Sequence, residues 1–208
     1  TDKIVNWIGQ QSAEKPFFVY FTPVAVHNPI TPSKATAGKS KGGPFCDFIS
    51  DLDLSVGRVL EVLDQKGFAK DTLVIFTSDN GGMLNQGGQD AWKAGHALNG
   101  DLFGFKFDAW EGGHRVPFIA RWPGKIKAGA VSEHVGGFVD FLATSAELAG
   151  VSLQAESDGI SYLPALLGKN EEQKEHPYLF WNFLEQGGKR SVLQWPWKLI
   201  HLNTGVVD

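Results

Sequence analysis

The distribution of apolar residues along the chain predicts that strands and helices alternate. Two short runs without polar alternation, FFVYF at 17–21 and TLVIFTS at 72–78, fit strands that are covered on both faces. Between these runs, apolar residues recur at helical spacing from Ile49 to Leu63, and Gly67 ends this segment. A strand–helix–strand order is typical of a parallel sheet flanked by helices.

Further elements continue this pattern. A short helical stripe covers residues 4–8, a third strand is predicted at 116–122 (VPFIARW), and an amphipathic helix is predicted at 138–150 with a capping glycine at its end. The segment 81–106 is rich in Gly, Asn and Gln and predicts a long irregular loop, which in a compact domain is more often functional than idle. We therefore predict an α/β fold with a mostly parallel central sheet flanked by helices.

The pattern changes after Gly168. Short aromatic and β-branched runs (YLFWNF, SVLQW and WKLIHL) are separated by turn residues, which favours antiparallel strands in a smaller region. We predict that residues 1–168 belong to the α/β domain and that residues 169–208 begin a small C-terminal antiparallel β subdomain.

Composition narrows the class of protein. The 208 residues are 42% hydrophobic and 20% charged, which is ordinary for a soluble globular protein. A net charge of -4 gives no reason to expect nucleic acid or an anionic membrane surface as a partner. No apolar run reaches the length of about 18 residues that predicts a membrane span. The single Cys46 excludes an intrachain disulfide.

Two oxygen-bearing side chains stand where the strand at 72–78 ends. Asp79 offers a carboxylate and Asn80 an amide oxygen, and Gly81 and Gly82 then let the backbone turn sharply. Ligands of open α/β sheets bind beyond the carboxyl ends of strands, and hard oxygen donors suit calcium or magnesium rather than zinc. The alternative is an ordinary strand-to-loop turn whose side chains bond local backbone.

Two further side chains are candidates for chemistry near that strand end. His27 follows the strand at 17–21 in a proline-rich loop, so it is expected to face the same crevice as a proton donor. Lys106 precedes a sharp turn predicted at 111–113, which could hold its ammonium near the crevice to bind an oxyanion. A structural histidine and a solvated lysine are the alternatives for these two positions.

Longer stretches of the chain resemble a known family. PFFVYFTPVAVHNP, DLDLSVGRVLEVLDQKG, DTLVIFTSDNGG and KFDAWEGGHRVPFIARWPGKIKAG occur in the order and at the spacing of the second half of a sulfatase, within the alkaline phosphatase superfamily. FVDFLATSAELAGV and DGISYLPALLG resemble the segments that follow. The resemblance implies an alkaline phosphatase-like mixed sheet between helices, followed by a small antiparallel sheet packed on a C-terminal helix. It also implies hydrolysis of sulfate esters of sugars or aryl alcohols.

The resemblance assigns roles to four side chains. Asp79 and Asn80 fall on two ligands of a metal ion, normally calcium, with magnesium as the alternative. His27 falls on a histidine that contacts the sulfate and protonates the departing alcohol. Lys106 falls on a lysine that binds sulfate oxygens. Family members are commonly exported, which implies a periplasmic, extracellular or lysosomal location.

Two parts of the family's site are absent from the sequence. The C/S-x-P-x-R motif, whose Cys or Ser becomes the formylglycine nucleophile, does not occur, and Cys46 lies in CDFIS instead. The early pair of aspartates that supplies most of the metal's negative charge is also absent. We expect an internal piece of a longer sulfatase, with formylglycine in the missing N-terminal part, that alone binds calcium weakly and lacks turnover. Such a piece is expected to self-associate through an exposed sheet edge.

Two other functions stay open. A phosphatase or phosphodiesterase of the same superfamily would use two zinc ions and usually shows Asp-His at the position of Asp79 and Asn80, so Asn80 argues against it. A non-catalytic binding module could keep the sulfatase fold and lose the chemistry.

Several residues carry smaller expectations. Glu111 and Arg115 are expected to pair and hold the turn between them. His96 and Asn99 lie in the long loop and either shape a substrate pocket or are solvated. The remaining histidines are expected to be structural or exposed, namely His134, His176 and His201.

Overall fold

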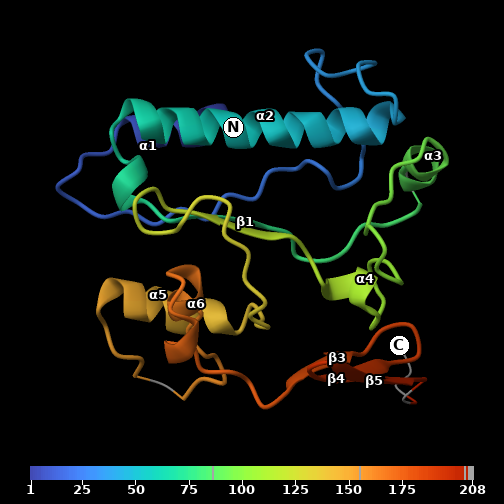
Figure 1. The fold of residues 1–208 in the computed structure, drawn as a ribbon. Coiled ribbons are helices and arrows are strands. Elements are labelled where there is room, and N and C mark those ends of the chain that lie inside the picture. Colours follow the sequence, from blue (N-terminus) through green and yellow to red (C-terminus); the bar gives the residue numbers. More distant parts are fainter. Residues whose placement is uncertain (86, 155, 204, 206–208) are drawn as a thin grey trace. The chain divides into compact units, whose positions relative to one another are not determined.

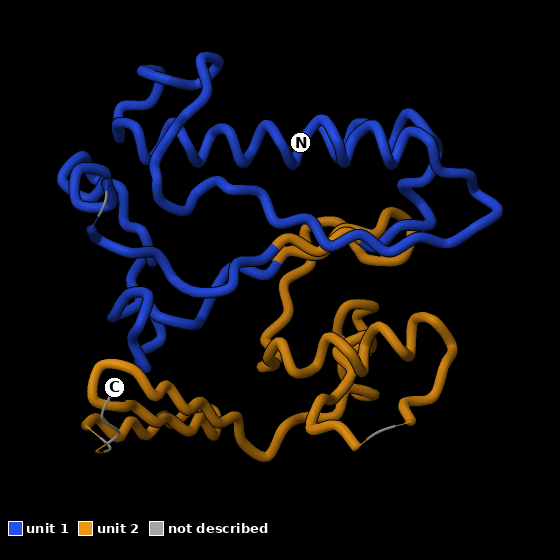
Figure 2. Tube along the Cα trace, turned by 180° about the vertical axis from the view of Figure 1, so that it is seen from behind, with its two compact units in different colours: residues 1–73, 77–118 blue, residues 74–76, 119–208 orange. Residues whose placement is uncertain are grey.

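The computed structural model describes residues 1–208 except 86, 155, 204 and 206–208. The chain divides into two compact units, which Figure 2 shows in different colours. Unit 1 comprises residues 1–73 and 77–118, and unit 2 comprises residues 74–76 and 119–208. The domain boundary between residues 168 and 169 stays a prediction.

Unit 1 is built around one long helix (Figure 1). Its helices are α1 (Asp2–Gly9), α2 (Gly43–Gln65), the 3-10 turn η1 (Ala69–Asp71), α3 (Gly88–Lys93) and α4 (Glu111–His114). Helix α2 confirms the helix predicted from the apolar stripe. It begins earlier than predicted because Pro44 stands in its first turn, where a missing N–H removes no helical hydrogen bond.

A glycine fixes the end of α2. Gly67 has a φ of 73°, and its N–H donates to the carbonyl of Asp64 at 3.0 Å, while the N–H of Phe68 donates to the carbonyl of Leu63 at 2.8 Å. Glycine adopts this left-handed conformation without the strain that a Cβ would cause. The cap turns Phe68 into the core, where its ring centroid lies 5.8 Å from that of Phe17.

The segment 17–21 is not a strand, so this prediction is wrong. Among the described residues, no neighbouring strand pairs with it, and a β-strand requires such a hydrogen-bonded neighbour. Phe17 packs against Trp7 with 5.8 Å between ring centroids, but Phe18 and Tyr20 are 69% and 83% exposed. The apolar run is therefore covered on one side rather than on both.

The other two predicted strands of the α/β domain are confirmed. β1 (Val74–Thr77) and β2 (Phe118–Arg121) are hydrogen-bonded neighbours in a two-stranded sheet. At the end of β1, the hydroxyl of Thr77 donates to the carbonyl of Pro117 at 2.9 Å. The candidate metal ligands thus follow a strand end that is tied to the next strand.

Unit 2 contains the later helices and an antiparallel sheet. These elements are α5 (Asp140–Ala149), α6 (Leu163–Leu166), the 3-10 turn η2 (Asn170–Glu172), β3 (Leu179–Phe183), β4 (Lys189–Gln194) and β5 (Trp197–Leu202). Strands β3, β4 and β5 pair antiparallel in that order, which confirms the strands predicted after Gly168. Gly150 caps α5 with a φ of 65°, as predicted.

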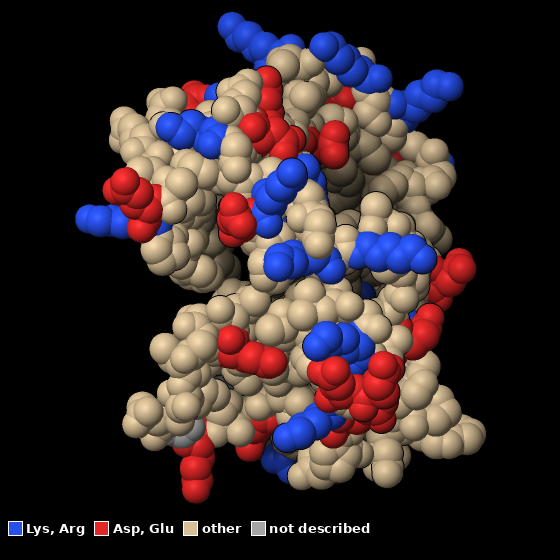
Figure 3. Space-filling model, turned by 60° about the vertical axis from the view of Figure 1, so that its left-hand side comes forward, with Lys and Arg blue, Asp and Glu red and all other residues tan. Residues whose placement is uncertain are grey.

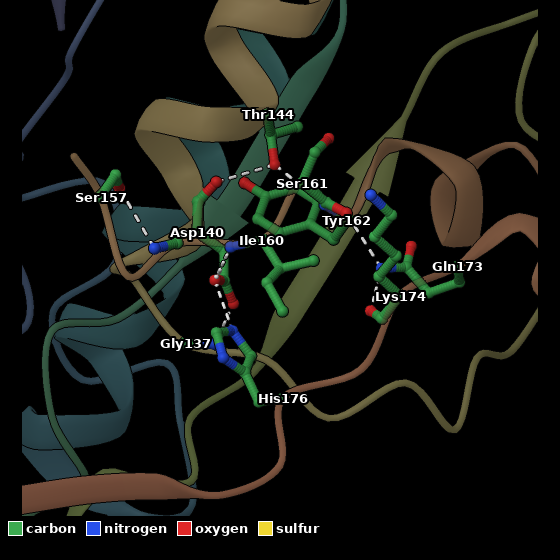
Figure 4. Close-up of polar contacts among 11 residues, drawn as sticks. Gly137, Asp140, Thr144, Ser157, Ile160, Ser161, Tyr162, Gln173, Lys174 and His176 are labelled. Carbon is green, nitrogen blue, oxygen red and sulfur yellow. Dashed lines mark hydrogen bonds and ion pairs between the residues drawn. The ribbon is translucent and has the colours of Figure 1, made fainter. Parts of the chain in front are cut away.

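A buried carboxylate organises unit 2. Figure 4 shows Asp140, the first residue of α5, at the centre of a polar network. Its Oδ1 accepts hydrogen bonds from His176 Nε2 at 2.7 Å and from the N–H of Ile160 at 2.8 Å, and its Oδ2 accepts from the N–H of Gly137 at 2.8 Å. Asp140 is completely buried, so it ties three chain segments together and gives His176 the structural role expected for it.

The network continues one turn further along α5. The hydroxyl of Thr144 donates to the carbonyl of Asp140 at 2.9 Å and accepts from the N–H of Tyr162 at 3.1 Å. The chain leading into α6 is therefore held against α5 by side chains from two successive helical turns. Burial raises the pKa of the Tyr162 hydroxyl above its ordinary value, with the charge of Asp140 adding to the shift.

The described surface is mixed in charge. On the face that Figure 3 shows, Lys and Arg side chains are interspersed with Asp and Glu side chains, as the small net charge of -4 suggests. None of the helices in the described part of the chain combines the length and the apolar character needed to cross a membrane.

Candidate functional site

The loop after β1 presents the two candidate metal ligands. Asp79 is exposed and Asn80 is half-buried. Asn80 Nδ2 donates to the carbonyl of Gly81 at 3.0 Å, and the hydroxyl of Ser78 donates to the carbonyl of Asn80 at 2.9 Å. Because the amide nitrogen is bonded within the loop, Oδ1 of Asn80 is left to act as a cation ligand beside the carboxylate of Asp79.

Close backbone packing explains the glycines that follow. The N–H of Gly81 donates to the carbonyl of Gly113 at 2.9 Å, which places the loop directly against α4. A Cβ on Gly81 would overlap the carbonyl oxygen of Gly112, which is backbone and cannot swing away. The DNGG sequence is therefore more than a flexible turn. Without side chains on its glycines, the loop after β1 can pack directly against the backbone of α4.

Replacing Gly81 with alanine is expected to lower the free energy of unfolding by about 1–3 kcal/mol, because the packed backbone must shift to admit the methyl group. Gly57, an exposed helical glycine of α2 with open space around its Cβ position, provides the matched control. Gly57→Ala is expected to stabilise by about 0.5–1 kcal/mol. Urea unfolding followed by tryptophan fluorescence measures both. Equal stability of the two variants would contradict the packing described here.

The loop that carries Lys106 is bonded to this strand end. The backbone N–H of Lys106 donates to the carbonyl of Gly82 at 2.9 Å, so Lys106 is fixed beside the loop of Asp79 and Asn80. Phe107 follows with a φ of 77°, a left-handed conformation that is strained for an aromatic residue. Such strain persists only where surrounding contacts over-determine the backbone, and it is concentrated at functional sites.

His27 meets the side chain of Lys106. Its Nε2 lies 3.3 Å from Lys106 Nζ, and its Nδ1 lies 2.9 Å from the carbonyl of Asn28. A carbonyl only accepts, so Nδ1 carries the hydrogen, and in the neutral ring Nε2 accepts from the lysine ammonium. His27 is exposed and Lys106 is half-buried, so the pair is open to a ligand.

A second carboxylate anchors the loop that follows His27. Asp51, on α2, accepts hydrogen bonds from the N–H of Ser33 at 2.6 Å, from the hydroxyl of Ser33 at 2.7 Å and from the hydroxyl of Thr36 at 2.9 Å. Burial alone would raise the pKa of Asp51, but these hydrogen bonds outweigh it and lower the pKa below its ordinary value. Such a carboxyl stabilises the fold above its unfolded-state pKa and loses that effect as the pH falls through the folded-state value.

The structure thus brings together the candidates that the sequence indicated. Lys106 contacts His27 through its side chain and the DNGG loop through its backbone. The segment 81–106 is less irregular than predicted, because it contains the short helix α3, and the turn predicted at 111–113 is the single-turn helix α4. The predicted pairing of Glu111 with Arg115 is confirmed, with 3.6 Å between Glu111 Oε2 and Arg115 Nη1.

The donor set at the strand end fits a hard divalent cation only in part. Within the described ranges, no group of three or more His, Cys, Asp and Glu side chains is arranged to hold a metal ion. Asp79 and Asn80 offer two oxygens, whereas calcium takes about 6–8. The chemistry of these two donors fits calcium or magnesium, but two oxygens alone do not complete the coordination of either ion.

Two profiles of known protein families together match most of the chain. Residues 1–151 match the family profile described as Sulfatase. Residues 102–206 match the profile described as N-sulphoglucosamine sulphohydrolase, C-terminal. The two matches overlap at the loop that carries Lys106, and all four candidate site residues lie within the first.

Individual relatives agree with the family match. The N-acetylgalactosamine-6-sulfatase of Canis lupus familiaris is 40% identical over 165 residues, which are 76% of this chain and 30% of that protein. The steryl-sulfatase of Homo sapiens is 38% identical over 173 residues, which are 82% of this chain and 29% of that protein. The chain therefore spans about 30% of the length of these relatives.

A solved structure shares the fold. A protein of Bacteroides thetaiotaomicron, described in connection with the metabolism of multiple glycosaminoglycans, superposes with a TM-score of 0.84 at 30% sequence identity. The match covers 96% of this chain and 42% of that chain. It confirms the predicted fold class, an alkaline phosphatase-like α/β fold followed by a small antiparallel β subdomain.

Proposed function

Because the chain belongs to the sulfatase family, we propose that it forms the part of a sulfuric ester hydrolase that binds the metal ion and the sulfate group. The observation that carries this proposal is the contact between His27 and Lys106 beside the DNGG loop. Sulfate ester cleavage requires neutralisation of the sulfuryl oxygens and protonation of the departing alkoxide, and these residues supply groups for both.

Lys106 is assigned to the sulfate oxygens. Its backbone is bonded to Gly82. Its Nζ lies 5.4 Å from the centroid of the Phe107 ring and 3.3 Å from His27 Nε2, so the ammonium contacts two aromatic side chains. A fixed cation stabilises the charge that develops on the sulfuryl oxygens better than a solvated one, because no reorganisation is needed during the reaction.

His27 is assigned to the leaving group. The hydrogen on Nδ1 is committed to the carbonyl of Asn28, so the proton that is exchanged must reside on Nε2, the atom that faces Lys106. When both side chains are protonated, two positive charges lie about as close as a hydrogen bond allows. The negatively charged sulfate ester group bound between them would relieve this repulsion, and the protonated Nε2 could then donate to the ester oxygen as the S–O bond breaks and the alcohol departs.

Asp79 and Asn80 are assigned to calcium, with magnesium as the alternative. The ion, when bound, would act as a Lewis acid on the sulfuryl oxygens. Two donors hold calcium weakly, so further carboxylates are proposed to come from a part of the protein outside residues 1–208.

The nucleophile is also proposed to lie outside these residues, as formylglycine. Cys46 does not suit this role, because it is half-buried in the first turns of α2. Its sequence context, CDFIS, also lacks the proline and arginine of the family's motif.

The proposed substrate is a sulfated carbohydrate, and the proposed location is outside the cytoplasm. Two of the proteins compared are named for, or connected with, amino sugars and glycosaminoglycans, which supports this class. Because one relative is a steryl-sulfatase, sulfate esters of other alcohols are the second candidate substrate class.

The experiment is an assay of the full-length protein that contains this chain, matured in a host that forms formylglycine. Sulfate release from N-acetylgalactosamine 6-sulfate should exceed release from 4-nitrophenyl sulfate, and addition of a calcium chelator should abolish it. Faster phosphate release from 4-nitrophenyl phosphate would support the phosphatase alternative and contradict the proposal. Residues 1–208 alone should release no sulfate from either ester.

A further inference from the structure

We propose that Asn99 is a positioning residue that fixes Lys106 relative to Asp79 and Asn80, an inference that rests on the proposed function. Asn99 lies in the long loop and contacts none of these three side chains in the described contacts. Its effect is exerted through the backbone of the two loops that carry them.

The side-chain amide of Asn99 joins both loops. Its Oδ1 accepts a hydrogen bond from the N–H of Gly82 at 2.7 Å, and its Nδ2 donates to the carbonyl of Gly104 at 2.9 Å. Gly82 also accepts from the N–H of Lys106 at 2.9 Å. Gly82 is thus bonded through its N–H to Asn99 and through its carbonyl to Lys106, so the three segments form a closed ring of hydrogen bonds.

The range of these contacts distinguishes Asn99 from an ordinary turn residue. Asparagine in a turn usually bonds the backbone within two or three residues of itself. Here the side-chain partners are Gly82 and Gly104, which lie 17 and 5 residues away along the chain. The local turn is closed by backbone alone, through the N–H of Leu102 and the carbonyl of Asn99 at 3.1 Å.

The surrounding packing leaves this ring little freedom. Gly104 is buried, and a Cβ on Gly112 would overlap its carbonyl oxygen, so the acceptor of Asn99 Nδ2 is held from the other side by α4. The carboxylate of Asp108 accepts from the N–H of Phe105 at 2.9 Å. The stretch from Gly104 to Lys106 is therefore fixed at each residue, as the strained conformation of the next residue requires.

Only an amide satisfies both contacts. Gly82 offers a donor and Gly104 an acceptor, and the asparagine side chain presents the complementary acceptor and donor on one short group. Aspartate has the same shape but no donor, so it would place a carboxylate oxygen against the carbonyl of Gly104. Alanine would remove both contacts and leave the N–H of half-buried Gly82 and the carbonyl of buried Gly104 without these partners.

The experiment compares Asn99→Asp and Asn99→Ala with Asn85→Ala in the full-length protein. Asn85 is an exposed asparagine of the same long loop whose side chain makes no hydrogen bond among the described contacts, so its variant should behave as the parent protein. Displacement of a positioned group typically lowers turnover by about 10–100-fold. We expect that loss in kcat/KM for both Asn99 variants.

A double-mutant cycle separates positioning from general destabilisation. If Asn99 acts through Lys106, then Asn99→Asp should cost far less kcat/KM in a Lys106→Ala background than in the parent protein. Full additivity of the two substitutions would overturn the inference.

Two readouts do not depend on turnover. Hydrogen exchange at the amides of Gly82 and Lys106 should accelerate in Asn99→Ala, and calcium affinity measured by calorimetry should fall. Unchanged exchange and affinity would overturn the inference. Absence of sulfate release from the parent protein would refute the proposed function instead, while the exchange result would still report on the ring.

Discussion

Replacement of Lys106 with alanine is expected to reduce kcat/KM for sulfate release by about a hundredfold or more in the full-length protein. Removal of one fixed electrostatic group at a reacting oxygen has about this effect. The structure adds a reason for a large value, because the backbone of Lys106 is bonded to Gly82 and its ammonium lies 3.3 Å from His27 Nε2. Its loss removes the hydrogen-bond donor to the imidazole. Under the proposed function it also removes the cation that binds the sulfate oxygens.

The control for this prediction is Lys93→Ala. Lys93 ends α3 in the same long loop and is exposed, and among the described residues its side chain makes only a 4.0 Å ion pair with Asp90. Its loss should leave turnover within twofold of the parent. Lys106→Arg retains the charge but replaces a compact ammonium with a planar fork, and it should recover only part of the rate. Equal activity of the Lys106→Ala and Lys93→Ala variants would contradict a role of Lys106 in the reaction.

Replacement of Asp140 with alanine is expected to destabilise the protein by about 3–5 kcal/mol. Removal of one member of a buried charged or hydrogen-bonded pair leaves its partners unsatisfied, and losses of this size are typical. Three donors are affected here, His176 Nε2 and the N–H groups of Gly137 and Ile160. Because Asp140 is completely buried, water cannot replace the lost carboxylate without opening the network.

Glu147→Ala provides the matched control on the same helix. Glu147 is an exposed acid of α5, and its removal should change the free energy of unfolding by less than about 0.5 kcal/mol. Chemical unfolding curves of the two variants measure the difference. A loss below about 1 kcal/mol for Asp140→Ala would show that the network is dispensable. His176→Gln, which keeps a donor near Oδ1, should fall between the two variants.

Sequence patterns predicted most of the regular elements because their signals are local. Helix α2 has a long apolar stripe and a glycine at its end, and α5 has both as well. The run at 17–21 misled for a physical reason. Apolar composition indicates that a segment is at least partly buried. It does not show whether a neighbouring strand is present to form backbone hydrogen bonds with it.

The candidate site was predicted unevenly. Asp79 and Asn80 could be identified from the residues alone, because they directly follow an apolar run that predicts a strand. His27 and Lys106 are 79 residues apart, and strand-end and turn arguments placed both near one crevice. The strand assumed before His27 is absent, so that argument reached the right place from a wrong element. The hydrogen bonds of Asn99 to Gly82 and Gly104 could not be predicted, because the sequence of a glycine-rich loop does not show whether an asparagine is solvated or bonds distant backbone.

A crystal structure of the full-length protein with calcium and sulfate tests most directly whether His27, Lys106, Asp79 and Asn80 form one anion and metal site. We predict a sulfate within about 3 Å of both Lys106 Nζ and His27 Nε2. We also predict a calcium ion about 2.3–2.6 Å from oxygens of Asp79 and Asn80 and bound to the same sulfate. A sulfate bound away from Lys106, or a calcium ion without Asp79 among its ligands, would contradict the account.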